Sequence, residues 1–333
     1  PAAICRRTVL AEILVTGAVG FIGAAVSHAL LARGDRVIGV DNLSDYYDVS
    51  LKQARLDRLA AQGGFDFHRI DISDRDRMLK LAVEFPDITH IVHLAAQPGV
   101  RYSLENPYAY ITANVMGQVV ILELARALPG LKHFVYASSS SVYGANTKTP
   151  FSVGDAVDRP NSLYAATKRV DELFGHTYAH LYGIPSTGLR FFTVYGPWGR
   201  PDMAPILFAH AITAGAPIKV FNHGEMWRDF TYIDDIVDGV LRALNRPAQG
   251  TPPHAIYNLG NHKSEKLTDF IAEIEKALGA KAVMEMAPMQ PGDVPATYAD
   301  IAASTRDLGF APATPIGVGI PKFVDWFRDY YRV

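Results

Sequence analysis

Residues 13–23 read Ile-Leu-Val-Thr-Gly-Ala-Val-Gly-Phe-Ile-Gly, and this stretch decides the fold. Its first four residues form a short apolar run, which is typical of a buried strand in a parallel sheet. Glycines spaced GxxGxxG follow, and a helical pattern continues through Leu31. Such a turn lets a pyrophosphate approach the backbone and the free N–H groups of the helix N-terminus. The stretch therefore predicts a dinucleotide-binding loop, with these candidate residues: Gly17, Gly20, Phe21, Ile22 and Gly23.

A second apolar strand, expected over residues 36–40, ends in Asp41. An acid at this distance beyond the glycines accepts hydrogen bonds from the adenosine ribose hydroxyls, and its charge repels a 2′-phosphate. The sequence therefore favours NAD over NADP. Asn42, directly after the acid, is a further candidate for contact with the cofactor.

Apolar strands continue to alternate with helical patterns, and we expect strands over residues 65–70, 90–96 and 132–137. This alternation predicts an α/β fold with a doubly wound parallel (Rossmann) sheet that binds ligands at the carboxyl ends of its strands. Further cofactor candidates at these ends are Asp71, Ile72, Leu94, Ala95 and Ala96. His93 lies on a strand without acidic neighbours, so we interpret it as a packing residue and expect no metal site.

The second half of the chain has a different texture. Residues 192–201 are rich in turn formers and aromatic side chains, which suits a binding loop. Segments rich in Gly, Pro and polar residues then alternate with helical stretches. We therefore expect residues 12–190 to form an NAD-binding domain and residues 191–333 to form mainly a smaller substrate lobe that is interleaved with it.

Composition argues against several classes of function. Lys and Arg number 32 against 34 Asp and Glu, a formal net charge of −2, which leaves no basic footprint for nucleic acid or an anionic membrane. No apolar run reaches the length of a membrane span. The single Cys5 rules out an internal disulfide and suits a reducing compartment, and residues 1–12 lack the apolar core of a secretory signal. We expect a cytoplasmic protein that binds neither nucleic acid nor membrane.

Tyr164 and Lys168 are the candidate catalytic pair. On a helix, residues four apart lie on one face, one turn from each other. A phenol, with its pKa of about 10, is a poor base at neutral pH, and a neighbouring ammonium favours the phenolate. The spacing alone occurs on many helix surfaces, so its weight comes from its place after the dinucleotide-binding pattern.

The order of these motifs (GxxGxxG, a strand-end Asp, a serine-rich strand end and YxxxK) resembles that of the extended short-chain dehydrogenase/reductase family, the nucleotide-sugar epimerases and dehydratases. The similarity spans residues 12–330. Within that family, residues 41–48, 97–103 and 196–203 resemble the UDP-glucuronate 4-epimerases.

The resemblance implies a role for each matching residue. Tyr164 is the catalytic acid and base, Lys168 tunes it and binds the nicotinamide ribose, and Ser139 hydrogen-bonds the 4-oxygen of the sugar. Arg228 corresponds to an arginine on the diphosphate, and Asp293 to an acid on the uridine ribose. Further candidates for substrate contact are Arg101, Ser140, Ser141, Thr193 and Arg200, and among them Thr193 and Arg200 are expected to hold the carboxylate of a uronate.

Positions 140 and 141 bear on which reaction follows removal of the C4 hydride, and position 290 bears on which sugar is the substrate. Family dehydratases and glucuronate decarboxylases resemble one another in carrying acids where this chain has Ser140 and Ser141, and a serine does not ionise at neutral pH. Gln290 stands where UDP-galactose epimerases resemble one another in having an arginine. The resemblance therefore implies an NAD-dependent UDP-glucuronate 4-epimerase.

Two other functions stay open at this point. One is a different UDP-sugar 4-epimerase, of the UDP-glucose/galactose type. The other is a non-catalytic NAD-sensing scaffold, against which the intact Tyr164, Lys168 and Ser139 speak. The resemblance also implies a homodimer, formed through the helices near residues 107–128 and 163–181.

Overall fold

The computed structural model describes residues 10–290 and 292–333, so Cys5 lies outside the described residues. The first strand, β1 (Glu12–Thr16), leads through the glycine turn into helix α1 (Phe21–Arg33). Gly17 has φ +67°, and a Cβ there would lie 2.7 Å from the backbone nitrogen of Ala95. The turn therefore requires glycine for both its conformation and its close approach to a neighbouring chain segment.

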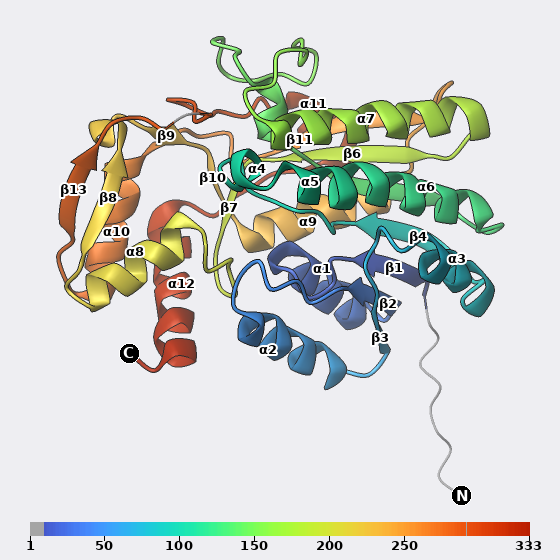
Figure 1. Ribbon diagram of the computed structural model, residues 1–333, viewed down its shortest axis with the longest axis horizontal. Helices are drawn as coiled ribbons and strands as arrows, with labels where there is room; N and C mark the ends of the chain where they lie inside the picture. Colours follow the sequence, from blue (N-terminus) through green and yellow to red (C-terminus); the bar gives the residue numbers. More distant parts are fainter. Residues whose placement is uncertain (1–9, 291) are drawn as a thin grey trace, which may run out of the picture.

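Seven parallel strands form the central sheet, in the order β11-β6-β5-β4-β1-β2-β3 (Figure 1). The order reverses direction at β1, so the predicted doubly wound fold is confirmed, and all carboxyl ends meet at one edge. The strands other than β1 are β2 Arg36–Asp41, β3 Phe65–Arg69, β4 Ile88–His93, β5 His133–Ser139, β6 Ser186–Phe191 and β11 His254–Leu259.

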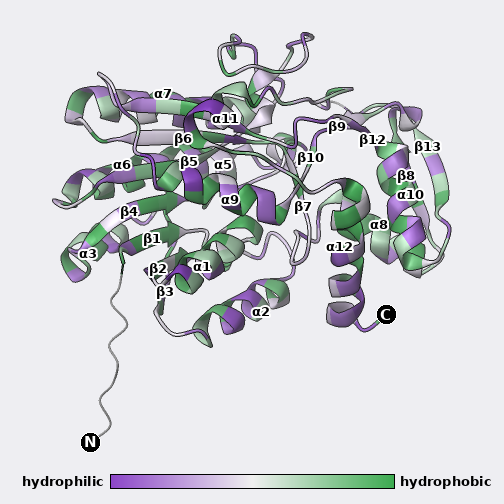
Figure 2. Cartoon of the chain, turned by 180° about the vertical axis from the view of Figure 1, so that it is seen from behind, coloured by the Kyte–Doolittle hydropathy of each residue, from purple (hydrophilic) through white to green (hydrophobic). Residues whose placement is uncertain are grey.

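Helices cover both faces of this sheet (Figure 1). One face carries α3 Arg75–Glu84, α4 Tyr102–Glu105, α5 Pro107–Tyr110, the π-helix η1 Ile111–Met116, α6 Gly117–Ala127 and α7 Leu163–Tyr182. The opposite face carries α1, α2 Val49–Ala60, α9 Ile233–Leu244 and α11 Ala302–Leu308. Figure 2 shows that the central strands are largely hydrophobic, as strands buried on both faces should be.

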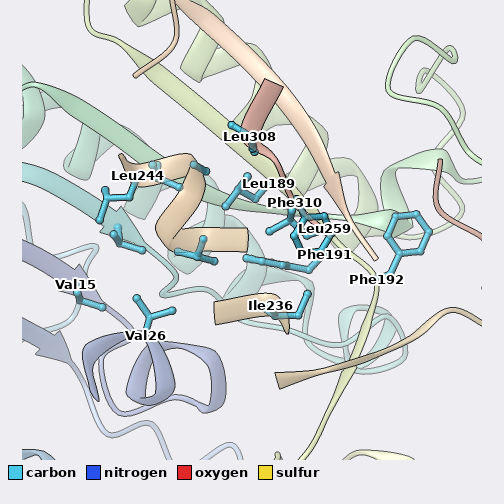
Figure 3. Packing of buried hydrophobic residues seen from close by; sticks show 14 of the residues in the cluster. Val15, Val26, Leu189, Phe191, Phe192, Ile236, Leu244, Leu259, Leu308 and Phe310 are labelled. Carbon is cyan, nitrogen blue, oxygen red and sulfur yellow. The ribbon is translucent and has the colours of Figure 1, made fainter. Parts of the chain in front are cut away.

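The core between the sheet and its second helical layer is a continuous cluster of aliphatic and aromatic side chains (Figure 3). Val15 and Leu189 come from the sheet, Val26 from α1, and Ile236 and Leu244 from α9, and all five are essentially inaccessible to solvent. Because α9 and β11 come from the second half of the chain, their burial here joins the two halves into one core.

The rest of the second half forms a smaller lobe beside the carboxyl edge of the sheet (Figure 1). Its elements are β7 Thr193–Tyr195, α8 Ala204–Thr213, β8 Pro217–Phe221, the short turn η3 Asn222–Gly224, β9 Trp227–Arg228, β10 Phe230–Tyr232, β12 Glu265–Lys266, α10 Leu267–Leu278, β13 Val283–Ala287 and α12 Ile316–Tyr331. It has its own cluster of buried side chains, in which Phe230 and Phe270 stack with centroids 3.9 Å apart.

Two strand ends differ from the expected ones. The strand expected to reach Ala96 ends at His93, because the next residues turn over the glycine loop and the Ala95 N–H donates to Thr16 Oγ1. The strand expected to end at Ala137 continues to Ser139, whose partner in the next strand is Phe191. The extension places the serines at the carboxyl edge of the sheet.

The expectation about apolar length was wrong for one helix. Residues 107–127 form a single helical stretch that is long and apolar enough to cross a membrane by length and composition. No unbroken apolar run is visible in the sequence, because the uncharged Thr112, Asn114 and Gln118 and, near the end, the charged Glu123 and Arg126 interrupt it. Half of its most apolar window is buried inside the protein, where η1 and α6 pack against α3 and α7, as in the core helix of a globular domain.

Candidate active site

A cleft of about 930 Å³ lies at the carboxyl edge of the sheet, between the sheet and the smaller lobe. Its lining includes the dinucleotide loop, the ends of β2, β4 and β5, the start of α7 and segments of the second half. The structure brings all the residues proposed from the sequence into this cleft: Gly17, Gly20, Phe21, Ile22, Gly23, Asp41, Asn42, Asp71, Ile72, Leu94, Ala95, Ala96, Arg101, Ser139, Ser140, Ser141, Tyr164, Lys168, Thr193, Arg200, Arg228 and Asp293.

The helix that carries the Tyr–Lys pair begins at the cleft. The hydroxyl of Ser162 accepts a hydrogen bond from the Ala165 N–H at 3.1 Å and so caps the first turn of α7. Tyr164 lies in this first turn and Lys168 in the next. The Tyr164 ring meets the ring of Tyr110 edge to face, with centroids 6.1 Å apart. The cap and the ring contact fix where the Tyr164 hydroxyl enters the cleft.

Lys168 is almost fully buried, at 3% exposure. Its Nζ donates to the carbonyl oxygen of Ala137 and to Oδ2 of Asp171, each at 2.9 Å. Burial opposes the charge of the lysine, but Asp171 and Tyr164 raise the Lys168 pKa. Burial raises the pKa of Asp171 to about 6, against the effect of Lys168. The ammonium is therefore held charged, one turn from Tyr164.

Ser139 ends β5 and caps the following turn η2 (Ser140–Tyr143). Its Oγ accepts from the Ser141 N–H at 3.1 Å and lies 3.1 Å from the Ser141 hydroxyl. These bonds hold the Ser139 hydroxyl at the cleft wall. No carboxylate of the chain occupies positions 140 or 141.

A buried ion pair stands directly behind this wall. Arg190 binds Glu172 through two hydrogen bonds of 2.7 and 2.9 Å, and Ser138 donates to the same carboxylate at 2.7 Å. Burial raises the pKa of a carboxyl group, but the bonds from Arg190 and Ser138 leave the pKa of Glu172 below its ordinary value. The network ties α7 to β5 and β6, and so keeps the elements that carry the candidate catalytic residues in register.

Sequence reasoning missed Asn114, which is buried on the π-helix. Its Oδ1 accepts from the Gln97 N–H at 2.7 Å, and its Nδ2 donates to the Gln97 carbonyl and to the Thr167 hydroxyl. It therefore joins the loop after β4 to α7. A buried amide needs hydrogen-bond partners, but the signal in the sequence was weak, because Gln118 is a second buried amide in the same helical stretch.

The dinucleotide side of the cleft fits the predicted cofactor. A Cβ on Gly23 would overlap the carbonyl of Gly17, and no side chain caps the N-terminus of α1, which leaves its backbone N–H groups to an anion. Asp41 is 7% exposed and accepts from the Leu43 N–H at 2.8 Å. Burial raises the Asp41 pKa, and the ammonium of Lys52, which sequence reasoning also missed, opposes that shift.

Asn42 and Asp71 lie together at the neighbouring strand end. The Asn42 amide donates to Asp71 at 2.7 Å, and the hydroxyl and N–H of Ser73 donate to the other carboxylate oxygen. Burial raises the pKa of Asp71, but these hydrogen bonds outweigh it and the pKa is lowered. Asp71 is therefore an ionised acceptor at the place where the adenine end of a dinucleotide would lie.

Replacing Asp41 with alanine tests the assignment of the ribose site. We expect NAD to bind about 10- to 100-fold more weakly, the effect of losing a hydrogen bond to a charged group. NADP should lose much less affinity, because the carboxylate that repels its 2′-phosphate is also removed. Fluorescence titration of both dinucleotides measures this, with Asp66→Ala on the exposed part of β3 as the matched control. Equal losses for NAD and NADP would contradict the assignment.

Three of the proposed substrate-binding residues form one group at the far end of the cleft. Arg101 pairs with Asp293 at 3.1 Å and lies over the ring of Phe221, 4.8 Å from its centroid. Arg228 donates to the carbonyls of Trp227 and Pro295, and burial lowers its pKa against the influence of Asp293. Two cations beside one carboxylate make this end suitable for a diphosphate and a ribose.

Arg200 belongs to a second group. Its guanidinium forms a bidentate pair with Asp202, at 3.0 and 2.5 Å. Its Nη1 makes no hydrogen bond within residues 10–290 and 292–333, so it has donors to offer to a ligand. Tyr46 lies beside the pair, where burial and the Asp202 carboxylate raise its pKa to about 12. Thr193 lines the same cleft and donates its backbone N–H to the carbonyl of Asp229. Asp202 and Tyr46 were not expected from the sequence.

The fold and the cleft together define a class of protein. A doubly wound sheet presents a glycine turn and a strand-end Asp for a dinucleotide, and a Tyr–Lys pair with a serine stands beside that site. Such an arrangement can move a proton at a sugar hydroxyl while a bound dinucleotide exchanges hydride with the adjacent carbon.

Comparison with known proteins places the chain within this class. Residues 13–260 match the model of the NAD dependent epimerase/dehydratase family, and the chain belongs to that family. The chain is 47% identical to UDP-glucuronate 4-epimerase 2 of Arabidopsis thaliana, over 96% of its own length and 76% of that protein. It is 45% identical to a probable UDP-glucuronate 4-epimerase of Rhizobium meliloti, over 96% and 97%.

A solved structure resembles the whole fold. The crystal structure of UDP-glucuronic acid 4-epimerase from Bacillus cereus, in complex with UDP-glucuronic acid and NAD, superposes with a TM-score of 0.89 at 34% sequence identity. The match covers 96% of this chain and all of that one.

Proposed function

We propose that this protein is a UDP-glucuronate 4-epimerase that interconverts UDP-glucuronate and UDP-galacturonate with bound NAD. The observation that carries the proposal is the composition of the cleft. Tyr164, Lys168 and Ser139 stand at its catalytic end without an ionisable group at positions 140 and 141, and Arg200 adds a cation whose Nη1 has no partner in the described part of the chain. The relatives and the solved structure with these names support the same reaction.

The residues of the chain have defined tasks in such a cycle. Tyr164 removes the proton of the 4-hydroxyl and later returns it from the same side chain, while Lys168 stabilises its phenolate form. Ser139 hydrogen-bonds the 4-oxygen of the sugar both when the proton leaves and when it returns. NAD, held by the glycine turn, Asp41 and the strand ends, supplies the hydride acceptor when it is bound. Because the hydride returns to the same carbon, the cycle has no net redox change, and because it returns to the opposite face, the configuration at C4 is inverted.

The sugar must rotate within the cleft between the two hydride transfers. The two cationic groups of the cleft, one around Arg228 and one around Arg200, suit this rotation. Arg228 and Asp293 hold the nucleotide end, so the 4-keto sugar can rotate without leaving. Arg101 lies with this group, which favours the diphosphate over the carboxylate as its ligand. Thr193 and Arg200 hold the carboxylate, which keeps the β-keto acid out of the geometry in which it would lose CO2.

Incubating the protein with UDP-glucuronate and following the products by NMR tests the function. Formation of UDP-galacturonate, without added NAD and without net NADH, is the expected result. Conversion of UDP-glucose to UDP-galactose in place of the uronate would favour the other UDP-sugar 4-epimerase. An absence of any conversion by protein that binds NAD would favour the non-catalytic NAD-sensing scaffold.

Replacing Lys168 with methionine should lower turnover about 100-fold or more, within the range for loss of acid–base assistance. The pH optimum of the remaining activity should move upward, because the phenolate loses its nearest positive charge. Turnover measured across pH 6–10 shows both effects. Because this substitution also leaves Asp171 buried without its cation, Lys168→Met/Asp171→Asn serves as the control. A pH profile like that of the wild type in both variants would rule out the tuning role.

The two halves of the chain have different tasks in this function. We propose that residues 12–190 mainly bind NAD and that residues 191–333 mainly bind the UDP-sugar. We further propose that the enzyme acts in the cytoplasm. We also propose a homodimer through α7 and the helical stretch 107–127. Large apolar side chains are exposed on these helices, among them Tyr108, Ile111, Met116, Leu173 and Leu181. The mass in solution tests the dimer.

A further inference from the structure

A buried arginine that does not line the cleft connects two of the loops that form it. Arg55 lies on α2 and its side chain is 0% exposed. Its Nη1 donates to the carbonyl of Val19 in the glycine turn at 3.1 Å. Its Nη2 donates to the carbonyls of Trp198 and Gly199, directly before Arg200, at 2.6 and 2.9 Å. One guanidinium therefore cross-links the dinucleotide loop and the loop that presents Arg200.

No carboxylate lies within 4.0 Å of Arg55 in residues 10–290 and 292–333. Its other partner is the hydroxyl of Tyr47 at 3.1 Å, and its Nε has no partner in this part of the chain. The Asp41 carboxylate interacts with Arg55 electrostatically but lies beyond 4.0 Å, so Arg55 is not explained as a direct stabilising ion pair, and burying its charge is costly. The planar fork of an arginine can instead reach several acceptors at once in a fixed geometry.

The loop before Arg200 depends on contacts from outside itself. Within the described residues, Arg55 supplies the only hydrogen bonds to the carbonyls of Trp198 and Gly199. Trp198 has φ +64°, a conformation that side-chain-bearing residues rarely adopt. Its ring is held by the guanidinium of Arg58, 4.4 Å from the ring centroid, and by Trp326 of α12. The backbone thus keeps an unfavourable conformation because α2 and α12 hold it.

We propose that Arg55 is a positioning residue that fixes the Arg200 guanidinium relative to the dinucleotide loop and thereby sets the preference for a sugar that carries a carboxylate. The inference rests on the proposed function. A bidentate arginine–carboxylate contact depends strongly on orientation, and the reacting carbon must at the same time face the dinucleotide held by the glycine turn. A neutral hexose makes no ion pair with Arg200, so a displaced loop penalises the uronate selectively.

Two substitutions of Arg55 separate charge from geometry. Arg55→Lys keeps the charge but cannot reach three carbonyls from both sides, and Arg55→Met fills the volume without a charge. In both variants, isolated with NAD and checked for cofactor content by absorbance, we expect the affinity for UDP-glucuronate to fall about 10-fold or more, as for a lost charge-assisted bond. The affinity for UDP-glucose, measured by calorimetry, should stay within about twofold. A purely structural defect would weaken both ligands equally, and that outcome would overturn the proposal.

Gln53→Ala is the matched control, because Gln53 lies exposed on the same helix and donates to Asp57, and it contacts neither of the two loops. It should leave the ratio of the two affinities unchanged, and a loss equal to that of Arg55→Lys would also overturn the proposal. In an Arg200→Ala background, Arg55→Lys should cause no further loss for UDP-glucuronate, since both act through one contact. Additive losses would show that Arg55 acts elsewhere.

Hydrogen exchange on the holoenzyme tests the cross-link independently of substrate affinity, by comparing Arg55→Met with the wild type. Backbone amides of residues 196–203 should exchange about tenfold faster or more in Arg55→Met, because within the described residues Arg55 supplies the hydrogen bonds to two carbonyls of that loop. Unchanged exchange of residues 196–203 in Arg55→Met would show that Arg55 does not hold the loop and would overturn the proposal. If the wild type shows no preference for UDP-glucuronate, that result contradicts the proposed function itself. The exchange measurement still tests whether Arg55 holds the loop, because it does not depend on the substrate.

Discussion

Tyr164→Phe is expected to abolish epimerisation and to leave NAD binding nearly intact. The phenylalanine ring can keep the edge contact with Tyr110, so the start of α7 should hold its place. No proton can then be exchanged with the 4-hydroxyl, and turnover should fall at least by the 10²- to 10⁴-fold that acid–base catalysis contributes. Turnover of UDP-glucuronate by NMR and NAD content by absorbance measure the two halves of this prediction.

Tyr178→Phe provides the matched control for that loss. Tyr178 lies on the same helix and its hydroxyl donates to Glu123, away from the cleft. The control should turn over UDP-glucuronate at the wild-type rate within about a factor of two, because the half-buried ring keeps its packing and the lost hydroxyl lies outside the cleft. Near-normal turnover by Tyr164→Phe would end the assignment of this residue as the acid and base.

Arg200→Ala should weaken binding of UDP-glucuronate by about 1.5–3 kcal/mol, the range for hydrogen bonds to charged groups. UDP-glucose should not suffer this penalty, because it has no carboxylate. The freed carboxylate can then reach the geometry for C–C cleavage at the 4-keto stage, so the variant should release CO2 and form a 4-keto pentose, with NADH left on the enzyme. Mass spectrometry of the products and a binding titration check both effects.

The structure adds a control that separates attraction from repulsion. Once Arg200 is removed, Asp202 loses its bidentate partner and its charge faces the approaching uronate. Arg200→Ala/Asp202→Asn should therefore bind UDP-glucuronate better than Arg200→Ala alone but release the same pentose. If Arg200→Ala binds UDP-glucuronate as tightly as the wild type and releases no pentose, Arg200 does not hold the carboxylate, and Arg101 becomes the better candidate.

Local patterns in the sequence predicted the cofactor loop and five of the seven strands of the sheet, whereas β6 and β11 were not predicted. Residues 13–23 carry a strand, a turn and a helix start in one stretch. The glycine at position 17 marks a place where the backbone comes too close to Ala95 for a side chain to fit. The Tyr164–Lys168 pair is also local, because both residues lie on one helix a turn apart. The expected ends of β4 and β5 were less accurate, since hydrogen bonds from neighbouring segments set them.

The sequence by itself determined the fold class, the place of the dinucleotide and the side chains of the candidate catalytic pair, because each depends on residues within a few positions of one another. Only the tertiary structure decided which partners those side chains have. Asp171 pairs with Lys168, Asn114 joins the loop after β4 to α7, and Asp202 occupies two donors of Arg200. Arg55 shows the reason most clearly. Its three carbonyl acceptors lie 36, 143 and 144 positions away in the chain, and no periodicity in the sequence records a hydrogen bond between segments that meet only after folding.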